Sequence, residues 1–501
     1  MLTKYPVFCF ESLQRSKSAL SALSRIFAAA MVGLLGSACV STGESGPVPA
    51  AEGSAGGRPN IIFILADDMG YGDLSALGQE NFQTPNLDRM MDEGLFLSNH
   101  YSGSTVCAPS RAALVTGNHT GRLWQRGNFI VGPPRREIEF RADPLDITIA
   151  TRLREAGYHT ALIGKSPVSC NGTDPDLPNK KGFDHFFGFI SHRAAHRHYP
   201  QTLIRNGELV TIPGNEGYTG AVYSGDLFLD ESLRYLEGRK NETEPFFLHI
   251  ALSQPHADLA VPPEFEAPYL GRFDEVQIES GGYVDAPHPK ATYAGMVNFV
   301  DHTVRRVLQK LRELGIEENT LVIFSTDNGS YEEGGYHFTM LDSNAPFRGG
   351  KRDLYEGAIR VPTIAWWPGT IEPGTRSEHV SAFWDFAPTA LELAGVERPG
   401  TMDGISYLPT LLGQPALQGS HEFLYWEFHG RGGRQAVRFG DWKGVRLGFF
   451  DDPDSPIELY DLSVDPAEAR DVAAEQPEIV EKIDAFMRAA HQPNPNFPIY
   501  Q

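Results

Sequence analysis

Cysteine is scarce in this chain, which has only four in 501 residues. Cys9 and Cys39 lie near the N-terminus, so Cys107 and Cys170 are the two that remain for the body of the protein. Two cysteines cannot form a disulfide framework for a chain of this length. The scarcity therefore excludes a disulfide-stapled fold and leaves any isolated cysteine in need of an explanation.

Positive charge is also in short supply. The chain has 43 Lys and Arg residues against 64 Asp and Glu, which gives a formal net charge of -21. Proteins bind nucleic acid through basic surfaces, so this composition argues against nucleic acid as a partner. An anionic substrate would have to be held by cations gathered locally. A hydrophobic content of 41% allows a large core and excludes global disorder.

Long hydrophobic runs are missing, and residues 26–35 form only a short one, after a basic start. Such a run suits a signal peptide better than a membrane span. The small residues before Cys39 are similar to a bacterial lipoprotein cleavage box, so we expect residues 1–39 to be a lipoprotein-type signal peptide with Cys39 as the lipidation site. Ordinary cleavage and an uncleaved anchor are the alternatives. The Gly- and Ser-rich residues 40–58 read as a flexible linker. The protein is then exported, to the periplasm or cell surface of a bacterium, and meets a membrane only through its lipid anchor.

The body of the chain alternates apolar strand patterns with helical ones. Strands are predicted at 60–66, 160–163, 246–252 and 320–325, and helices at 84–94, 146–156 and 291–314. This alternation predicts an α/β fold for residues 59–410, with a large doubly wound mixed sheet flanked by helices. Short strands are predicted at 423–428, 435–439, 442–447 and 458–462, followed by a helix at 475–490. Residues 411–501 are therefore expected to form a small subdomain with an antiparallel sheet and one helix.

Two of the buried strands end in polar pairs. The first runs into Asp67 and Asp68, and the last runs into Asp327 and Asn328. Ligands of open α/β sheets gather at the carboxyl ends of strands, and four side-chain oxygens there would suit calcium or magnesium. Either pair alone could simply cap a turn. Their recurrence at two strand ends favours a metal site.

Cys107 opens the segment CAPSR, which ends at Arg111 and is followed by a helical pattern up to Gly117. Pro109 suits a first helical turn, so Cys107 is expected at a helix N-terminus, where an anion is favoured. The alternative is a buried structural cysteine.

The segment from Cys107 to Arg111 has the C-x-P-S-R form of the formylglycine-dependent sulfatases, a family of the alkaline phosphatase superfamily. The chain resembles that family, and in particular bacterial carbohydrate sulfatases and arylsulfatases, in a series of further segments that follow the family's order. These segments are Asp67-Asp68, 84–88, 157–165, Pro255-His256, 327–329, 348–351, 356–362 and 459–462. Such an ordered set, spread over residues 58–490, is far more specific than one short motif. The resemblance implies an alkaline-phosphatase-like fold and sulfuric ester hydrolysis.

The resemblance also implies a modified nucleophile and a metal. A maturation enzyme would oxidise Cys107 to formylglycine, and one hydroxyl of its hydrate would attack sulfur while the alcohol departs. The second hydroxyl would let the adduct collapse and release sulfate. One calcium ion would be held by Asp67, Asp68, Asp327 and Asn328, together with an oxygen of modified Cys107.

Four further residues gain roles in the same way. Arg111 would orient the hydrate, Lys165 and Lys351 would clamp sulfate oxygens, and His256 would protonate the leaving oxygen. Charge arithmetic agrees with these roles, because three carboxylates and a divalent cation sum to -1 and would repel a sulfate ester. The three cations of the motifs offset that repulsion.

One position departs from the family. Its Gly-Lys motif often continues with Trp and a His that contacts the aldehyde hydrate, but here Lys165 is followed by Ser166 and Pro167. Proline cannot transfer a proton, so another residue has to take that role. His196, within the histidine-rich segment 192–200, is a candidate for this role or for binding the sugar. A surface histidine cluster is the alternative.

Two rival functions stay open. One is a phosphate monoester or diester hydrolase of the same superfamily, and the other is a sulfated-glycan binding protein in which Cys107 is never converted. Export favours a sulfated carbohydrate as substrate. The aromatic residues of the segment 425–429 are candidates for a sugar pocket or for simple sheet packing.

Overall fold

Most of the body of the chain is described by the computed structural model, namely residues 57–132, 138, 140, 147–168, 174–217 and 219–500. The predicted signal peptide, nearly all of the linker, Cys39 and Cys170 lie outside these residues. Among the described helices, none combines the length and apolar character needed to cross a membrane.

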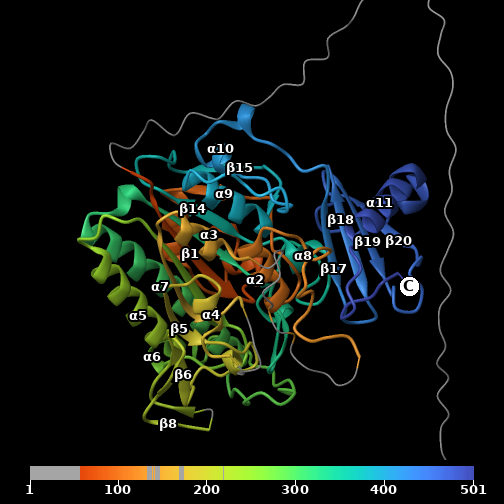
Figure 1. The fold of residues 1–501 in the computed structure, drawn as a ribbon. Coiled ribbons are helices and arrows are strands. Elements are labelled where there is room, and N and C mark those ends of the chain that lie inside the picture. The colour runs from red at the N-terminus through yellow and green to blue at the C-terminus, as the bar shows by residue number, and fades with distance from the viewer. Residues whose placement is uncertain are drawn as a thin grey trace, which may run out of the picture. The chain divides into compact units, whose positions relative to one another are not determined.

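A ten-stranded mixed sheet forms the centre of the fold (Figure 1). Its strands, in spatial order, are β15 (Thr375–Ser377), β2 (Leu95–Leu97), β14 (Thr363–Trp366), β11 (Thr320–Thr326), β1 (Asn60–Asp67), β10 (Phe246–Pro255), β4 (His159–Lys165), β5 (His185–Phe189), β6 (Thr202–Arg205) and β7 (Glu208–Thr211). The five strands from β11 to β5 run parallel, and antiparallel strands flank them on both sides.

The central strands are buried along nearly their whole length, and their residues are mostly apolar, because both faces of the sheet are covered. Alternate residues of β1 point to opposite faces: Phe63 and Leu65 join one core cluster, and Ile62 and Ile64 join the other. This two-sided burial is what makes 60–66 an unbroken apolar run in the sequence.

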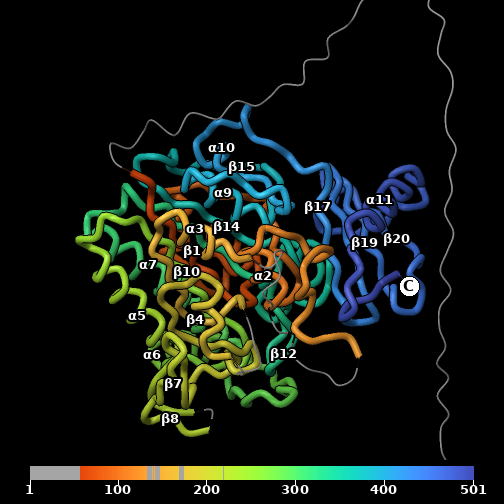
Figure 2. Tube along the Cα trace, in the orientation of Figure 1, coloured from red at the N-terminus to blue at the C-terminus, as the bar shows by residue number. Residues whose placement is uncertain are grey.

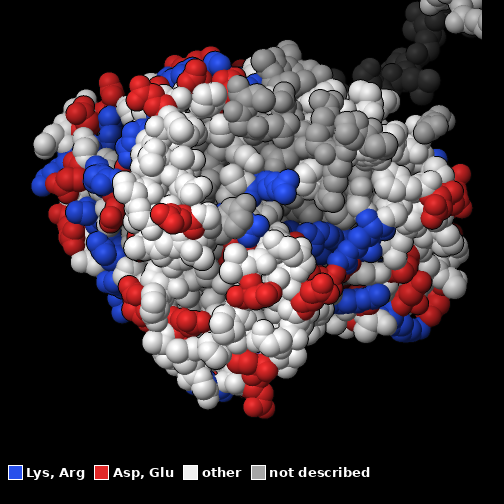
Figure 3. All heavy atoms as spheres, turned by 90° about the horizontal axis from the view of Figure 1, so that it is seen from below, with Lys and Arg blue, Asp and Glu red and all other residues white. Residues whose placement is uncertain are grey.

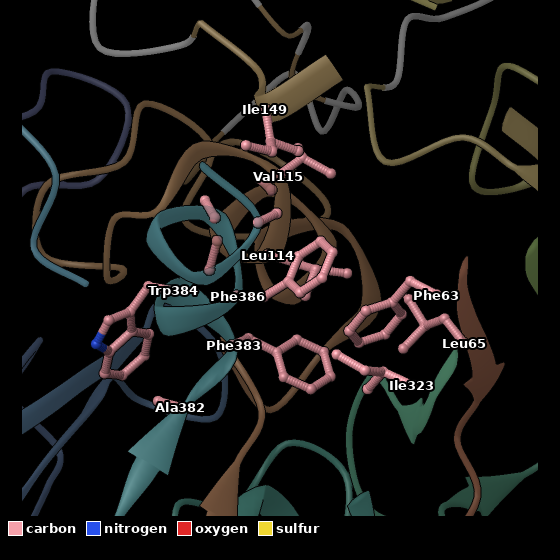
Figure 4. Packing of buried hydrophobic residues seen from close by; sticks show 14 of the residues in the cluster. Phe63, Leu65, Leu114, Val115, Ile149, Ile323, Ala382, Phe383, Trp384 and Phe386 are labelled. Atoms are coloured by element: carbon pink, nitrogen blue, oxygen red, sulfur yellow. The ribbon is translucent and has the colours of Figure 1, made fainter. Parts of the chain in front are cut away.

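Helices cover both faces of the sheet. On one face lie α2 (Cys107–Thr116), α3 (Ile149–Glu155) and α9 (Phe386–Leu393), and Figure 4 shows Leu114, Phe383 and Phe386 packed toward Phe63. On the other face lie α1 (Pro85–Asp92), α5 (Ser224–Arg239) and α7 (Pro289–Leu314). The doubly wound α/β fold is thereby confirmed. Helix α3 begins three residues later than predicted, because Thr148 caps it by accepting a hydrogen bond from the Thr151 amide.

The C-terminal part forms a separate four-stranded antiparallel sheet (Figure 2). Its strands are β17 (Leu424–Phe428), β18 (Arg434–Phe439), β19 (Trp442–Leu447) and β20 (Ile457–Asp461), in sequence order. Helix α11 (Pro477–Ala490) packs on this sheet through Ile483 and Met487, which contact Val437 and Leu459 within one buried cluster. The predicted antiparallel sheet with one helix is confirmed.

Candidate active site

The polar residues at the ends of β1 and β11 lie together. Because these parallel strands are neighbours, with Ala66 opposite Thr326, they end at the same edge of the sheet. The Asp68 amide donates to Asp327 Oδ1 at 3.0 Å, and Asn328 Nδ2 donates to Asp68 Oδ1 at 2.6 Å. Asp67, Asp68, Asp327 and Asn328 are all fully buried. The structure thus brings the four predicted metal ligands into one group.

Cys107 is the first residue of α2 and faces this group. The Sγ atom of Cys107 lies 4.0 Å from Asp68 Oδ1. Ser110, in the first turn of the same helix, donates from Oγ to the Asp327 carbonyl oxygen at 2.5 Å. Burial, followed by the charge of Asp67, raises the pKa of the Cys107 thiol well above its ordinary value. The unmodified side chain is therefore a neutral thiol, which is a weak nucleophile and a weak metal ligand.

Arg111 and Lys165 neutralise Asp67 and Asp327. Arg111 Nε donates to Asp327 Oδ2 at 2.7 Å, and Arg111 Nη2 lies 3.4 Å from Asp67 Oδ2. Lys165, the last residue of β4, donates to Asp67 Oδ2 at 2.5 Å. Burial alone would raise the pKa of Asp67, but these two cations lower it well below the ordinary value. Burial and the charge of Asp67 raise the pKa of Asp327, as expected for two carboxylates that share a guanidinium.

Lys351 and His256 lie beside Asp68 on the other side of the site. Lys351 Nζ lies 2.7 Å from Asp68 Oδ2, 2.9 Å from His256 Nε2 and 2.5 Å from Glu333 Oε1. Burial and the charge of Lys351 lower the pKa of His256. Its Nδ1 contacts the carbonyl oxygen of Ala257, so we infer that Nδ1 carries the hydrogen and Nε2 accepts from Lys351.

A cleft of about 820 Å³ opens beside these groups. Its lining includes Lys351, Glu333, Arg352, His192, His196 and Tyr283. His196 stacks on His256 with ring centroids 3.9 Å apart, and its Nδ1 lies 3.1 Å from the Tyr283 hydroxyl. Figure 3 shows a hollowed face of the molecule with Lys and Arg atoms around the hollow, although the chain as a whole is acidic. A buried cationic group at the edge of a cleft suits an anionic substrate.

Comparison with known protein families shows which family the chain belongs to. Residues 59–396 match the family model described as Sulfatase, which is more than half of the chain. The chain belongs to the sulfatase family. Residues 349–492 of this sulfatase also match the model described as N-sulphoglucosamine sulphohydrolase, C-terminal. The predicted family membership is confirmed.

Two curated relatives illustrate the similarity. The N-acetylgalactosamine-6-sulfatase of Canis lupus familiaris is 34% identical over 381 residues, which is 71% of this chain and 66% of the relative. The chain thus spans just under two thirds of that relative's length. The N-acetylgalactosamine-6-O-sulfatase of Bacteroides thetaiotaomicron is 26% identical over 523 residues, covering 89% of this chain and 96% of the relative.

Solved structures of similar fold support the same family. The crystal structure of Ps i-CgsB has a TM-score of 0.73 at 26% identity and covers 87% of this chain and 94% of its own. A second structure of Ps i-CgsB, with a TM-score of 0.72, is a complex with k-i-k-neocarrahexaose. The sulfatase fold predicted from the sequence therefore has close structural counterparts.

The residues at the strand ends fit a hard cation. Asp67 Oδ1 and Asn328 Oδ1 are buried, and neither has a hydrogen-bond partner within the described parts of the chain. One ligand atom each from Asp67, Asp68, Cys107 and His256 lies within 4.8 Å of the others. Since Nε2 of His256 accepts from Lys351, the oxygens are the donors left over, and oxygen donors suit calcium or magnesium.

Several features of the site escaped the sequence analysis. Glu333, which bonds both Lys351 and Arg352, belongs to no predicted motif, and its signal is only an acidic pair before Gly334 and Gly335. The histidine-rich segment is not a surface cluster, because His192 and His198 are buried and His196 is half-buried. The aromatic residues Tyr425 and Trp426 are fully buried in the C-terminal sheet interface, so packing explains them. They are absent from the cleft lining.

Proposed function

We propose that the chain is a sulfuric ester hydrolase that removes sulfate from a saccharide. The observation that carries this proposal is the buried group in which Cys107, three carboxylates and three cations meet beside a cleft. Arg111, Lys165 and Lys351 offset the carboxylates there, so an added divalent ion leaves the group positive and attractive to a sulfate monoester.

The nucleophile in this proposal is formylglycine, made from Cys107 by a maturation enzyme. Its hydrate supplies one hydroxyl for attack and a second whose loss of a proton allows sulfate to leave. The raised pKa of the thiol supports the need for conversion, because the unmodified cysteine is a poor nucleophile. Arg111 reaches the same carboxylates that border Cys107 and is placed to orient the modified side chain.

One calcium ion in this proposal is held by Asp67, Asp68, Asp327 and Asn328, with an oxygen of the modified Cys107. The ion supplies positive charge beside the sulfate oxygens and the nucleophile. The two free oxygens, Asp67 Oδ1 and Asn328 Oδ1, support this assignment.

Lys165 and Lys351 hold the sulfate. An ammonium has three hydrogens, so Lys165 can keep its bond to Asp67 and still donate to a sulfate oxygen. Lys351 has three acceptors already and exchanges one of them for a sulfate oxygen. His256 delivers a proton to the leaving oxygen in this proposal, from the Nε2 that lies 2.9 Å from Lys351 of the cleft lining. Because Nε2 accepts from Lys351 in the free protein, it has to take up a proton before it acts as the acid. His196, stacked on His256, is placed to contact the leaving sugar.

The substrate class rests on the relatives. Two of them are N-acetylgalactosamine 6-sulfatases by name, and Ps i-CgsB has a structure in complex with k-i-k-neocarrahexaose. We therefore expect a sulfated saccharide and place N-acetylgalactosamine 6-sulfate first in a substrate panel. Export by the predicted signal peptide, with lipidation at Cys39, would bring the enzyme to such material outside the cytoplasm.

The test is sulfate release after expression with and without a formylglycine-generating enzyme. The panel holds sulfated mono- and disaccharides, 4-nitrophenyl sulfate and 4-nitrophenyl phosphate, and the mass of the Cys107 peptide is measured on the same samples. We expect release from a sugar sulfate in proportion to the converted fraction. Faster hydrolysis of the phosphate, or full activity with an intact thiol, would contradict the proposal.

A further inference from the structure

His192 is a buried histidine with nothing to bind. The residue is 4% exposed, and neither ring nitrogen has a hydrogen-bond partner among the described residues. Leaving a buried polar group without a partner is costly, so native proteins seldom do it without a reason. His192 nevertheless lines the cleft, which means that whatever occupies the cleft can reach it.

The strand register places this segment beside Lys165. In the parallel pair β4–β5, Lys165 stands opposite Phe189, and the Ser166 amide donates to the Phe189 carbonyl oxygen at 2.9 Å. His192 follows three residues after Phe189. Burial, then the charges of Lys165 and Arg111, lower the pKa of His192 well below its ordinary value. The imidazole is therefore neutral and offers one donor and one acceptor.

We propose that His192 selects the substrate by hydrogen-bonding a free hydroxyl group of the sugar that carries the sulfate. This inference rests on the proposed function and adds His192 as a residue that recognises the sugar. A hydroxyl both donates and accepts, and so matches a neutral imidazole with two open positions. The sulfate itself has stronger partners in Lys165 and Arg111, which carry full positive charge.

A metal role fits His192 less well. The group of possible metal-binding side chains in the described chain contains Asp67, Asp68, Cys107 and His256 but not His192. In the free protein, water in the cleft can satisfy the imidazole, and a sugar hydroxyl takes the place of that water on binding.

The chain offers a matched control in His249. This residue lies on β10, is fully buried beside Phe63 and Phe247, and is absent from the cleft lining. His249→Leu therefore removes a buried imidazole of the same kind without touching the cleft. It should alter stability without altering the choice of substrate.

The experiment compares His192→Leu, His192→Gln and His249→Leu with the wild type. The readout is kcat/KM on 4-nitrophenyl sulfate and on the sugar sulfate that the wild type hydrolyses fastest. For His192→Leu we expect a loss of about 10- to 100-fold on the sugar and less than about 3-fold on the aryl sulfate, because only the sugar leaves a hydroxyl unpaired. His192→Gln, which keeps a donor and an acceptor, should retain most of the sugar activity. His249→Leu should keep the ratio of the two substrates.

A second measurement does not depend on the yield of folded His192→Leu, because each variant is compared with itself on different substrates. Analogues of the sugar sulfate lacking one free hydroxyl at a time are assayed with wild type and His192→Gln or His192→Leu. One analogue should be a worse substrate for the wild type but no worse for the leucine variant, because the two changes remove the same bond. Additive losses for every analogue, or equal losses on sugar and aryl sulfates, would overturn the inference. A converted wild type that hydrolyses no sulfate at all would overturn the proposed function itself.

Discussion

Two buried clusters of charged residues differ in how many of their polar atoms have hydrogen-bond partners. The strand-end cluster lies at the edge of the large sheet and consists of Asp67, Asp68, Asp327, Asn328, Arg111, Lys165 and Lys351. The Glu427 cluster lies at the C-terminal sheet. There Glu427 Oε1 accepts from Arg126 at 2.8 Å, and Glu427 Oε2 accepts from Tyr425 at 2.7 Å and contacts His491 Nδ1 at 2.8 Å.

Within the Glu427–Arg126 ion pair, both carboxylate oxygens and all three guanidinium nitrogens have a hydrogen-bond partner. The remaining nitrogens of Arg126 donate to the carbonyl oxygens of Leu123 and Gln492, both at 2.7 Å. The strand-end cluster instead leaves buried oxygens of Asp67 and Asn328 without partners among the described residues. A closed network specifies structure, whereas open positions in a buried cluster are typical of a site that binds a ligand.

The sharpest test of this contrast is Cys107→Ala. We expect sulfate release to fall by about 10⁴-fold or more, since the nucleophile is gone, while thermal unfolding stays close to that of the wild type. Sulfate release and Tm are measured on the same preparation. Residual activity within about tenfold of the wild type would show that Cys107 is structural.

A second test concerns the proton for the leaving group. A sugar alkoxide needs protonation and a nitrophenolate needs little, so His256→Ala should slow a sugar sulfate by about 10²–10⁴-fold and 4-nitrophenyl sulfate far less. Lys351→Ala should slow both together, because Lys351 holds the sulfate common to both. The measurement is kcat/KM for both variants on both substrates. Equal losses for His256→Ala would move the role to another histidine, with His196 next to test.

In the Glu427 cluster, a substitution should lower stability and leave activity unchanged. Glu427→Ala leaves the Arg126 charge buried and unpaired, so it should lower the free energy of unfolding by about 3–5 kcal/mol while kcat/KM of the folded protein is kept. Exposed Glu422→Ala is the matched control and should change stability by about 0.5 kcal/mol or less. Urea unfolding measures both. A stable Glu427→Ala variant with lost activity would break the comparison.

The smallest expected effect is that of calcium on stability. Calcium at about 100 times its Kd should raise the free energy of unfolding by about 2.7 kcal/mol, and a chelator should remove both this gain and the activity. Unfolding and sulfate release are followed across a calcium titration, with Glu427→Ala expected to gain the same amount. Active protein with full zinc, or with no metal, would refute the assignment to calcium.

Four of the five central parallel strands, β1, β4, β10 and β11, could be predicted from the sequence because burial on both faces leaves an apolar run. Strand β5 and the flanking antiparallel strands could not. Strands β2 and β14 hold three and four residues, too few to show a period, and their pairing depends on segments far apart in the chain. Helix α5 was missed as well, since its first turn is Ser224-Gly225-Asp226, a sequence typical of a turn.

The site divides in the same way. Residues within motifs, such as Asp67, Cys107 and Lys351, could be named in advance, and the structure brings them together, while their roles remain predictions. Glu333 and His192 could not be assigned, because their importance depends on which elements pack against them. For His192 that element is β4, whose register with β5 is a property of the sheet rather than of the local sequence.

The full burial of Cys107 limits when the residue can be modified. If Cys107 is converted as proposed, an enzyme that must grip the peptide around it can do so only before α2 packs against the sheet. The segment after α2 is in turn held by a residue far along the chain, since Asn494 donates to the Leu123 and Trp124 carbonyl oxygens at 3.2 and 3.0 Å. These two bonds cannot form before Asn494 has been synthesised, so the interval for modification extends at least to that point. A chain that folds before Cys107 is converted would then stay inactive. The rate of conversion relative to the rate of folding would decide the fraction of active enzyme.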